Sequence, residues 1–217
     1  MAGTMPPRAT AHPAPRRPPG GSQIRADRTR ALIIEETIRC IREDGFAAAS
    51  ASHITRRAGV TWGVIQYHFG GRDELLMAVV YHSYRKFLEA LEQIPDDLAQ
   101  MSIRQRVEIV VTAAWEGFST PTSMAAVEIL VATRTIRDAT AAQHIEELAA
   151  ALARLGKEIG QGLDATRATT IGNLVWTGLQ GMVLAQLVTP TPVDATRERR
   201  ALVELIATYI DQQARTK

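Results

Sequence analysis

The sequence predicts an all-α protein, and three observations lead to that fold class. Apolar residues recur at helical spacing, as at Ile34, Ile38 and Ile41. Glycines, prolines and capping residues divide the chain into helix-length segments. No alternating β pattern competes with these segments, and no repeat of fixed period is present. We therefore expect helices throughout from Ile24 onward.

The capping residues and helix breakers also set the limits of each expected helix. Gly45 and Gly59 end the first two helices, Ser50 caps the second, and Pro95 follows the fourth. In chain order, the expected helices cover residues 25–44, 50–58, 62–69, 73–93, 102–118, 122–137, 140 to 160 or 162, one that begins at 164 or 166, and 194–213.

The first thirty residues differ from the rest in composition. They hold six arginines against one aspartate, and six of the ten prolines lie in the first twenty positions. Such a segment has too little apolar surface to offset the entropy of ordering, so residues 1–22 are predicted to form a disordered Pro/Arg-rich arm. No apolar run of a secretory signal follows its arginines. For residues 1–22 a tolerated tail is favoured over a contact to DNA phosphates, whereas for Arg25 and Arg28 the phosphate contact is favoured.

The whole-chain composition is that of a globular protein. The 217 residues are 46% hydrophobic and 22% charged, which excludes a collagen-like or wholly disordered chain. The single Cys40 excludes an intrachain disulfide and favours the cytoplasm. Residues 168–193 carry no charge, but polar residues interrupt them and prolines close them, so we expect a helix buried on two sides of a soluble assembly and no membrane span.

Residues 50–69 have the geometry of a helix-turn-helix. Ile54 and Ala58 face a core, residues 59–61 form the turn, and Ile65 and Phe69 anchor the second helix. Polar and aromatic residues that can reach base edges, and a small one that permits close approach, then share the outer face. This face holds Thr61, Trp62, Gly63, Gln66, Tyr67 and His68.

The runs at residues 54–61, 62–69 and 70–76 closely resemble the DNA-binding domain of TetR-type transcriptional regulators, and the resemblance extends over residues 29–83. It implies an N-terminal three-helix DNA-binding domain and a C-terminal helical domain that binds a small ligand and dimerises. The predicted domains are therefore the arm, residues 1–22; the helix-turn-helix domain, residues 23–72; and the ligand-binding and dimerisation domain, residues 73–217.

The resemblance also implies roles for individual residues. Residues 61–64 match the start of the recognition helix, Tyr67 and His68 match phosphate-contacting or framework positions, and Arg72 matches a lysine that meets the DNA backbone. Gln66 stands where the family usually has tyrosine, so it can pair with adenine or simply bind a phosphate. The predicted DNA-binding residues are Arg25, Arg28, Ser52, Thr61, Trp62, Gly63, Val64, Gln66, Tyr67, His68 and Arg72.

Two further sites are expected in the C-terminal body. Small residues on the uncharged helix permit close helix approach, so this helix and the last one form either a dimer interface or the core of one subunit. The predicted interface residues are Gly178, Gly181, Met182, Ala185, Leu205 and Tyr209. Aromatic and Met residues at helical spacing form either a ligand pocket or core. The predicted pocket residues are Phe87, Trp115, Phe118, Met124, Trp176 and Gln180, with Glu116, Glu128 and His144 as further polar candidates.

The expected function is that of a homodimeric, ligand-responsive DNA-binding regulator. We expect a repressor that binds a palindromic double-stranded operator and is released by a small, mainly apolar effector. The alternative is a helical small-molecule-binding protein that has lost operator binding. The five histidines lack metal-ligand spacing, and the chain contains no nucleophile elbow or P-loop, so no enzyme, metal or cofactor is predicted.

Overall fold

The computed structural model describes residues 21–134, 150, 155–157, 159–160, 163–189, 191 and 193–215, and these residues contain helices and no strands. The all-α prediction is confirmed. The helices are α1 (Gly21–Asp44), η1 (Phe46–Ala48), α2 (Ala51–Ala58), α3 (Trp62–Phe69), α4 (Arg72–Leu91), η2 (Leu98–Gln100), α5 (Ile103–Phe118), α6 (Pro121–Ala132), α8 (Ala165–Val188) and α9 (Thr196–Arg215).

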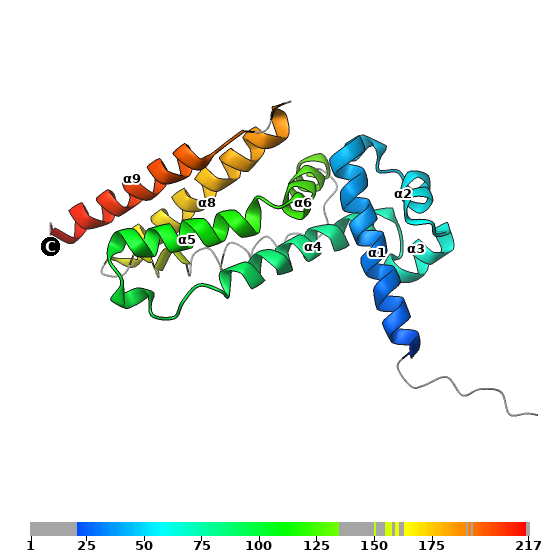
Figure 1. The fold of residues 1–217 in the computed structure, drawn as a ribbon, viewed down its shortest axis with the longest axis horizontal. Helices are drawn as coiled ribbons and strands as arrows, with labels where there is room; N and C mark the ends of the chain where they lie inside the picture. The colour runs from blue at the N-terminus through cyan, green and yellow to red at the C-terminus, as the bar shows by residue number, and fades with distance from the viewer. Residues whose placement is uncertain are drawn as a thin grey trace, which may run out of the picture.

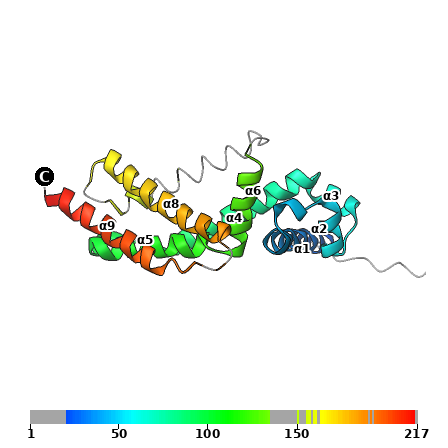
Figure 2. The same ribbon diagram turned by 90° about the horizontal axis from the view of Figure 1, so that it is seen from above.

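The chain is elongated, with α1, α2 and α3 at one end and α5, α8 and α9 at the other (Figures 1 and 2). Helix α4 runs from the first group into the second. Helix α6 stands between them and contacts both α1 and α4. Two helices therefore join the N-terminal part to the body.

Local capping explains where the helices begin and end. Gly59 adopts a left-handed conformation with φ of 63° and ends α2, as the sequence predicts. The side chain of Ser50 accepts a hydrogen bond from the backbone of His53 at the start of α2. Ser102 and Gln105 form a reciprocal capping box at the start of α5, and Asp164 caps α8.

The described residues form two hydrophobic cores. The first core packs α1, α2 and α3 around Ile33, Ile41, Ile54 and Ile65, all with at most 1% of their surface exposed. The second core lies in the body, where Val110 of α5, Leu179 of α8 and Ile210 of α9 are members. Each core excludes water from one end of the molecule.

Helices α4 and α6 contribute to both cores. Leu75, Leu76 and Val79 of α4 belong to the first core, whereas Phe87 of the same helix belongs to the second. On α6, Ala125 and Ile129 pack in the first core, while the adjacent Met124 packs in the second. The predicted boundary between residues 72 and 73 therefore falls ahead of three α4 residues that help to close the N-terminal core.

Three expected segments differ from the observed structure or lie outside the described residues. Helix α6 ends at Ala132 and not at residue 137, and the Thr133 hydroxyl that follows donates to the Ile129 carbonyl over 2.8 Å. The disordered arm was predicted to cover residues 1–22, but α1 begins at Gly21, so the prediction is wrong for residues 21 and 22. The rest of the predicted arm and most of the helix expected from residue 140 lie outside the described residues.

Among the described helices, α8 alone is long and apolar enough to cross a membrane by length and composition. Its most apolar window has a mean hydropathy of 1.3 and is 28% buried within the single chain. Val175, Leu179 and Val183 on one side of α8 pack in the second core. The core helix of a soluble protein passes the same length and composition test.

Replacing Ile129 with alanine should lower the free energy of unfolding by roughly 2–5 kcal/mol, because it opens a cavity in the first core. Val131 on the same helix is 51% exposed and provides the matched control. Val131→Ala should change the stability by less than about 0.5 kcal/mol. Urea unfolding followed by circular dichroism measures both variants. Equal losses would contradict the assignment of α6 to the N-terminal core.

Candidate nucleic-acid interface

Helix α3 is held against the N-terminal core from one side only. Ile65 is fully buried, and Val64 and Phe69 are half-buried beside it. The backbone N–H of Val60 donates to the Thr55 carbonyl over 3.1 Å, which fixes the turn between α2 and α3. The opposite face of α3 is therefore presented to solvent in a fixed orientation.

The exposed face of α3 carries the polar and aromatic residues that the sequence places there. Thr61, Gly63 and Gln66 are exposed, Trp62 is 39% exposed, and Tyr67 is 80% exposed. An aromatic side chain as exposed as Tyr67 does not pack on α1. The face has the size and chemistry to enter a major groove.

His68 differs from Tyr67 in its surroundings. It is half-buried, and its ring lies between those of Tyr67 and Phe69, with centroid distances of 5.0 and 6.3 Å. The guanidinium of Arg30 lies 4.5 Å from the centroid of the Phe69 ring on α3. His68 is therefore part of an aromatic row that ties α3 to α1, and only its neighbour Tyr67 is fully presented to solvent.

Arg72, which matches a DNA-contacting lysine in the resemblance, is engaged within the chain. Its Nε donates to the Ala49 carbonyl over 2.7 Å, and its guanidinium lies 5.3 Å from the centroid of the Phe46 ring. Its Nη1 is 3.5 Å from the Asp73 carboxylate. Arg72 thus fastens the start of α4 to the segment that precedes α2.

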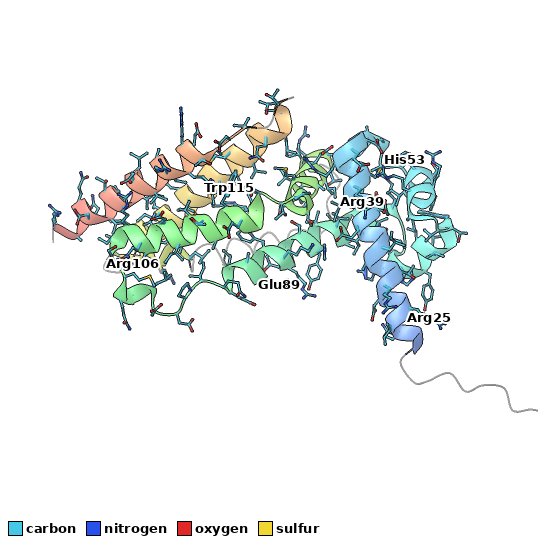
Figure 3. All side chains as sticks on the ribbon, viewed as in Figure 1. Arg25, Arg39, His53, Glu89, Arg106 and Trp115 are labelled. Atoms are coloured by element: carbon cyan, nitrogen blue, oxygen red, sulfur yellow. The ribbon has the colours of Figure 1, made fainter. Side chains whose placement is uncertain are left out.

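The remaining predicted DNA contacts lie on exposed surface. Arg25 and Arg28 are exposed on the N-terminal half of α1, and Figure 3 places Arg25 at the end that projects beyond the other helices. Ser52 is exposed at the start of α2, 3.3 Å from the Ser50 hydroxyl. All three side chains are accessible to a phosphate backbone.

An ion-pair network between α1 and α2 was missed by sequence reasoning. Arg57 donates to Glu43 over 2.5 Å and to Asp44 over 3.0 Å, and Asp44 also lies 2.9 Å from His53 Nε2. The hydrogen bond from His53 holds the pKa of Asp44 below its usual value, and Arg57 adds to the effect. The signal in the sequence is the acidic pair at residues 43–44, which ends α1, together with His53 and Arg57, which lie four residues apart on α2.

The same network brings together three groups that can bind metals. The ligand atoms of Cys40, Asp44 and His53 all lie within 4.8 Å of one another. Burial raises the pKa of the Cys40 thiol, and Asp44 already accepts from His53 and Arg57. Asp44 and His53 are thus already paired within the ion-pair network, and the thiol of Cys40 beside them is protonated.

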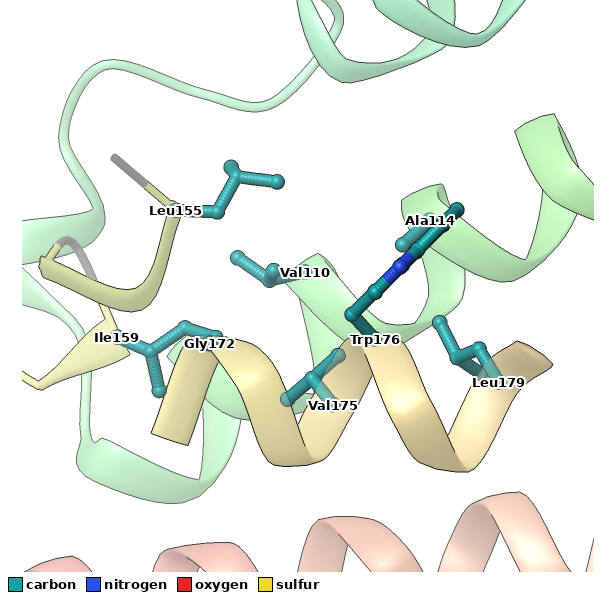
Figure 4. A pocket seen from close by; sticks show the side chains of 8 residues that line it. All are labelled: Val110, Ala114, Leu155, Ile159, Gly172, Val175, Trp176 and Leu179. Atoms are coloured by element: carbon teal, nitrogen blue, oxygen red, sulfur yellow. The ribbon is translucent and has the colours of Figure 1, made fainter. Parts of the chain in front are cut away.

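The body contains a small hollow between α5, α8, Leu155 and Ile159. Figure 4 shows Trp176 along one side of it. Every described side chain that lines it is apolar. The lining residues are Val110, Ala114, Leu155, Ile159, Gly172, Val175, Trp176 and Leu179.

Of the six predicted pocket residues, only Trp176 borders this hollow. Phe87 and Phe118 pack against Trp176, with ring centroids 5.8 and 4.6 Å away, and Met124 is buried in the same core. Trp115 is half-buried, and the Arg199 guanidinium lies 4.9 Å from its ring centroid. These aromatic residues act as core around the hollow.

Three polar candidates for the pocket have other positions. Gln180 is exposed, because it follows the core residue Leu179 by one helical step of about 100°. Glu128 accepts a hydrogen bond from the backbone N–H of Phe46. Glu116 is exposed on α5, and His144 lies outside the described residues.

Known proteins share the arrangement of the α1–α4 segment. Residues 33–79 match the family model described as "Bacterial regulatory proteins, tetR family". The HTH-type transcriptional regulator TtgW of Pseudomonas putida is 33% identical over 106 residues, which cover 49% of this chain and 75% of TtgW. The chain belongs to the TetR family.

Other TetR-type proteins extend the similarity over the body. The HTH-type transcriptional regulator BetI of Vibrio campbellii is 25% identical over 183 residues, or 83% of this chain and 89% of BetI. The crystal structure of the multidrug binding protein EbrR with imidazole has a TM-score of 0.59 at 21% identity and matches 83% of this chain and 93% of EbrR. FadR of Bacillus subtilis with stearoyl-CoA has a TM-score of 0.59 at 16% identity, over 82% and 97% of the two chains. As a TetR-family member, the chain is a DNA-binding transcriptional regulator.

In this TetR-family chain, the predicted dimer residues lie on α8 and α9 but do not all face solvent. Leu205 is 70% exposed and Gly181 is exposed, whereas Met182 and Ala185 are half-buried. A Cβ atom added at Gly178 would lie 3.3 Å from Leu202 of α9, so Gly178 serves the α8–α9 contact within one chain. Further exposed apolar residues on α8 were missed from the sequence: Leu174, Leu184 and Val188.

Replacing Asp44 with asparagine should destabilise the protein at neutral pH and have less effect in acid. The folded-state pKa of Asp44 is lowered, so the stabilisation it provides is complete above the ordinary Asp pKa of about 4 and is lost as the pH falls through the lowered value. Urea midpoints of wild type and Asp44→Asn between pH 3 and 7 measure the difference. Asp96→Asn, in the exposed loop after Pro95, is the control, and a pH-independent effect at Asp44 would count against the network.

Proposed function

We propose that the protein is a homodimeric repressor that binds a palindromic operator and leaves it when a small, mainly apolar effector binds the body. The observation that carries the proposal is the solvent-facing side of α3, where Thr61, Trp62, Gln66 and Tyr67 are exposed above a buried Ile65. A regulator of this kind acts on DNA in the cytoplasm.

Dimerisation is supported by the outer face of α8 and α9. Leu174, Leu184 and Val188 on α8 and Leu205 on α9 are between 46% and 73% exposed. Several exposed large apolar side chains on neighbouring helices are typical of an interface between copies of a chain. A two-fold dimer would present two recognition helices to half-sites about one DNA turn, ~34–36 Å, apart.

An apolar effector is supported by the lining of the hollow between α5 and α8. None of its described lining side chains carries a charge, and the indole of Trp176 is the one lining side chain among them with a polar atom, so an ionic ligand would lose most of its hydration there with little compensation. Proteins of the same fold are known in complex with imidazole and with stearoyl-CoA. Proteins of this fold have therefore been found with ligands of different chemistry.

Release from DNA requires that the effector favour one arrangement of the body. A ligand that binds the operator-bound and free arrangements equally well shifts neither. Helix α4 begins at Arg72 beside the helix-turn-helix and carries Phe87 into the core around the hollow. Movement of α4 would change the separation of the two recognition helices.

Footprinting on the DNA that flanks its own gene tests operator binding, since such regulators often act locally. The wild type should protect a palindromic site, and Tyr67→Ala should weaken binding by roughly 1–3 kcal/mol, or about 5- to 150-fold. Tyr81→Ala removes another exposed tyrosine, on α4, and should leave affinity unchanged. A wild-type chain that binds an apolar ligand but protects no DNA would favour the alternative of a ligand-binding protein without an operator.

Replacing Leu205 with glutamate should convert the dimer into monomers, because it places a charge in the proposed apolar interface. Size-exclusion chromatography with light scattering measures the mass, and operator affinity should fall with it. Val131→Glu, at an exposed apolar residue on α6, is the matched control and should remain dimeric. A Leu205→Glu variant that is still dimeric would place the interface elsewhere.

A further inference from the structure

The side chain of Glu128 on α6 makes a hydrogen bond to the segment that precedes the helix-turn-helix. The carboxylate Oε1 of Glu128 on α6 accepts a hydrogen bond from the backbone N–H of Phe46 over 2.7 Å, between residues 82 positions apart in the chain. Both residues are half-buried. A charged acceptor in such surroundings makes a stronger bond than a neutral one.

The bonded N–H belongs to a corner that has no cap of its own. Phe46 opens the short helix η1, and the preceding Gly45 has φ of 83° and supplies no side-chain cap. The first N–H groups of a helix have no partner within the helix. Glu128 supplies the partner from another part of the chain.

Helix α4 holds the opposite end of the same corner. Arg72 donates to the carbonyl of Ala49, and its guanidinium lies over the ring of Phe46. The next residue, Ser50, is the N-cap of α2. The corner formed by residues 46–49 is thus fastened by α4 and α6 immediately before the helix-turn-helix begins.

Helix α6 is itself fixed to the body by buried hydroxyl groups. Ser123 Oγ donates to the Gly117 carbonyl of α5 over 2.9 Å and receives a hydrogen bond from Ser83 of α4 over 3.2 Å. Both serines are buried. One end of α6 is therefore bonded to α4 and α5, and Glu128 bonds its other half to the corner.

We propose that Glu128 is a positioning residue for DNA binding, which holds the 46–49 corner, and with it α2 and α3, in register with the body. The proposal rests on the proposed operator binding. Without the bond, the helix-turn-helix samples orientations that do not fit both half-sites. When a dimer must bind two half-sites at once, its apparent affinity for DNA falls with the fraction of molecules whose helix-turn-helix is in the binding orientation.

The direction of the change in DNA affinity distinguishes a positioning role of Glu128 from a simple effect of its charge. Glu128→Ala removes a negative charge, which by electrostatics alone strengthens binding to DNA. Glu108→Ala removes a negative charge from an exposed site on α5 and is the matched control. Glu128→Gln also removes the charge but keeps a carbonyl oxygen that can accept from Phe46.

The test combines amide exchange with operator affinity in the full chain. NMR-detected hydrogen exchange at Phe46 should be about tenfold faster in Glu128→Ala, less accelerated in Glu128→Gln, and unchanged in Glu108→Ala. Affinity for the footprinted DNA should fall about five- to tenfold in Glu128→Ala and largely recover in Glu128→Gln. If Glu128→Ala does not fold, Glu128→Gln carries the test, with a smaller change in the same direction.

Two results would overturn the proposal even if the wild type binds its operator. Unchanged exchange at Phe46 in a folded Glu128→Ala shows that the bond does not hold the corner. Faster amide exchange at Phe46 in Glu128→Ala, together with an operator affinity equal to that of Glu108→Ala, shows that the corner does not position the helix-turn-helix. A wild type that protects no DNA refutes the operator and with it this role in DNA binding, whereas the exchange rates still decide separately whether Glu128 holds the corner.

Discussion

The hydrophobic core of the three N-terminal helices is shared with two helices of the body. A unit as small as α1, α2 and α3 buries a small share of its surface on folding and is marginal by itself. Leu75 and Leu76 of α4 and Ala125 and Ile129 of α6 complete the core. The stability of the α3 face therefore depends in part on the two body helices packed beneath it.

That dependence makes the joint between the two parts a route for regulation. Because α4 and α6 each carry residues into both cores, a change of packing in the body cannot leave the N-terminal core unaffected. The polar contacts of Arg72 and Glu128 then concentrate the effect on one corner of four residues. A single connecting helix would allow the helix-turn-helix to rotate relative to the body. The two contacts made by Arg72 and Glu128 restrict it to a few discrete orientations.

The sequence predicted local features well and long-range ones poorly, for a physical reason. The αL turn at Gly59, the Ser50 cap and the exposed side of α3 all follow from residues that lie within one or two helical turns. The bond between Glu128 and Phe46 joins residues that share no local pattern. Helical periodicity shows that a face is buried but not which helix covers it. Gly178 illustrates this limit, since its smallness serves a partner helix within the same chain.

The charges around the exposed face of α3 explain why the orientation of the helix-turn-helix is important for the proposed DNA binding. Arg57 is neutralised by Glu43 and Asp44, Arg30 lies over an aromatic ring, and Arg72 is bonded to a backbone carbonyl. Arginines used in this way contribute less to phosphate binding than exposed ones such as Arg25 and Arg28. In the proposed dimer, the electrostatic contribution of each subunit would be modest, so affinity would depend on direct contacts by α3 and on simultaneous engagement of both half-sites. Simultaneous engagement is geometric, so in that dimer the rigidity of the joint would become part of the binding energy.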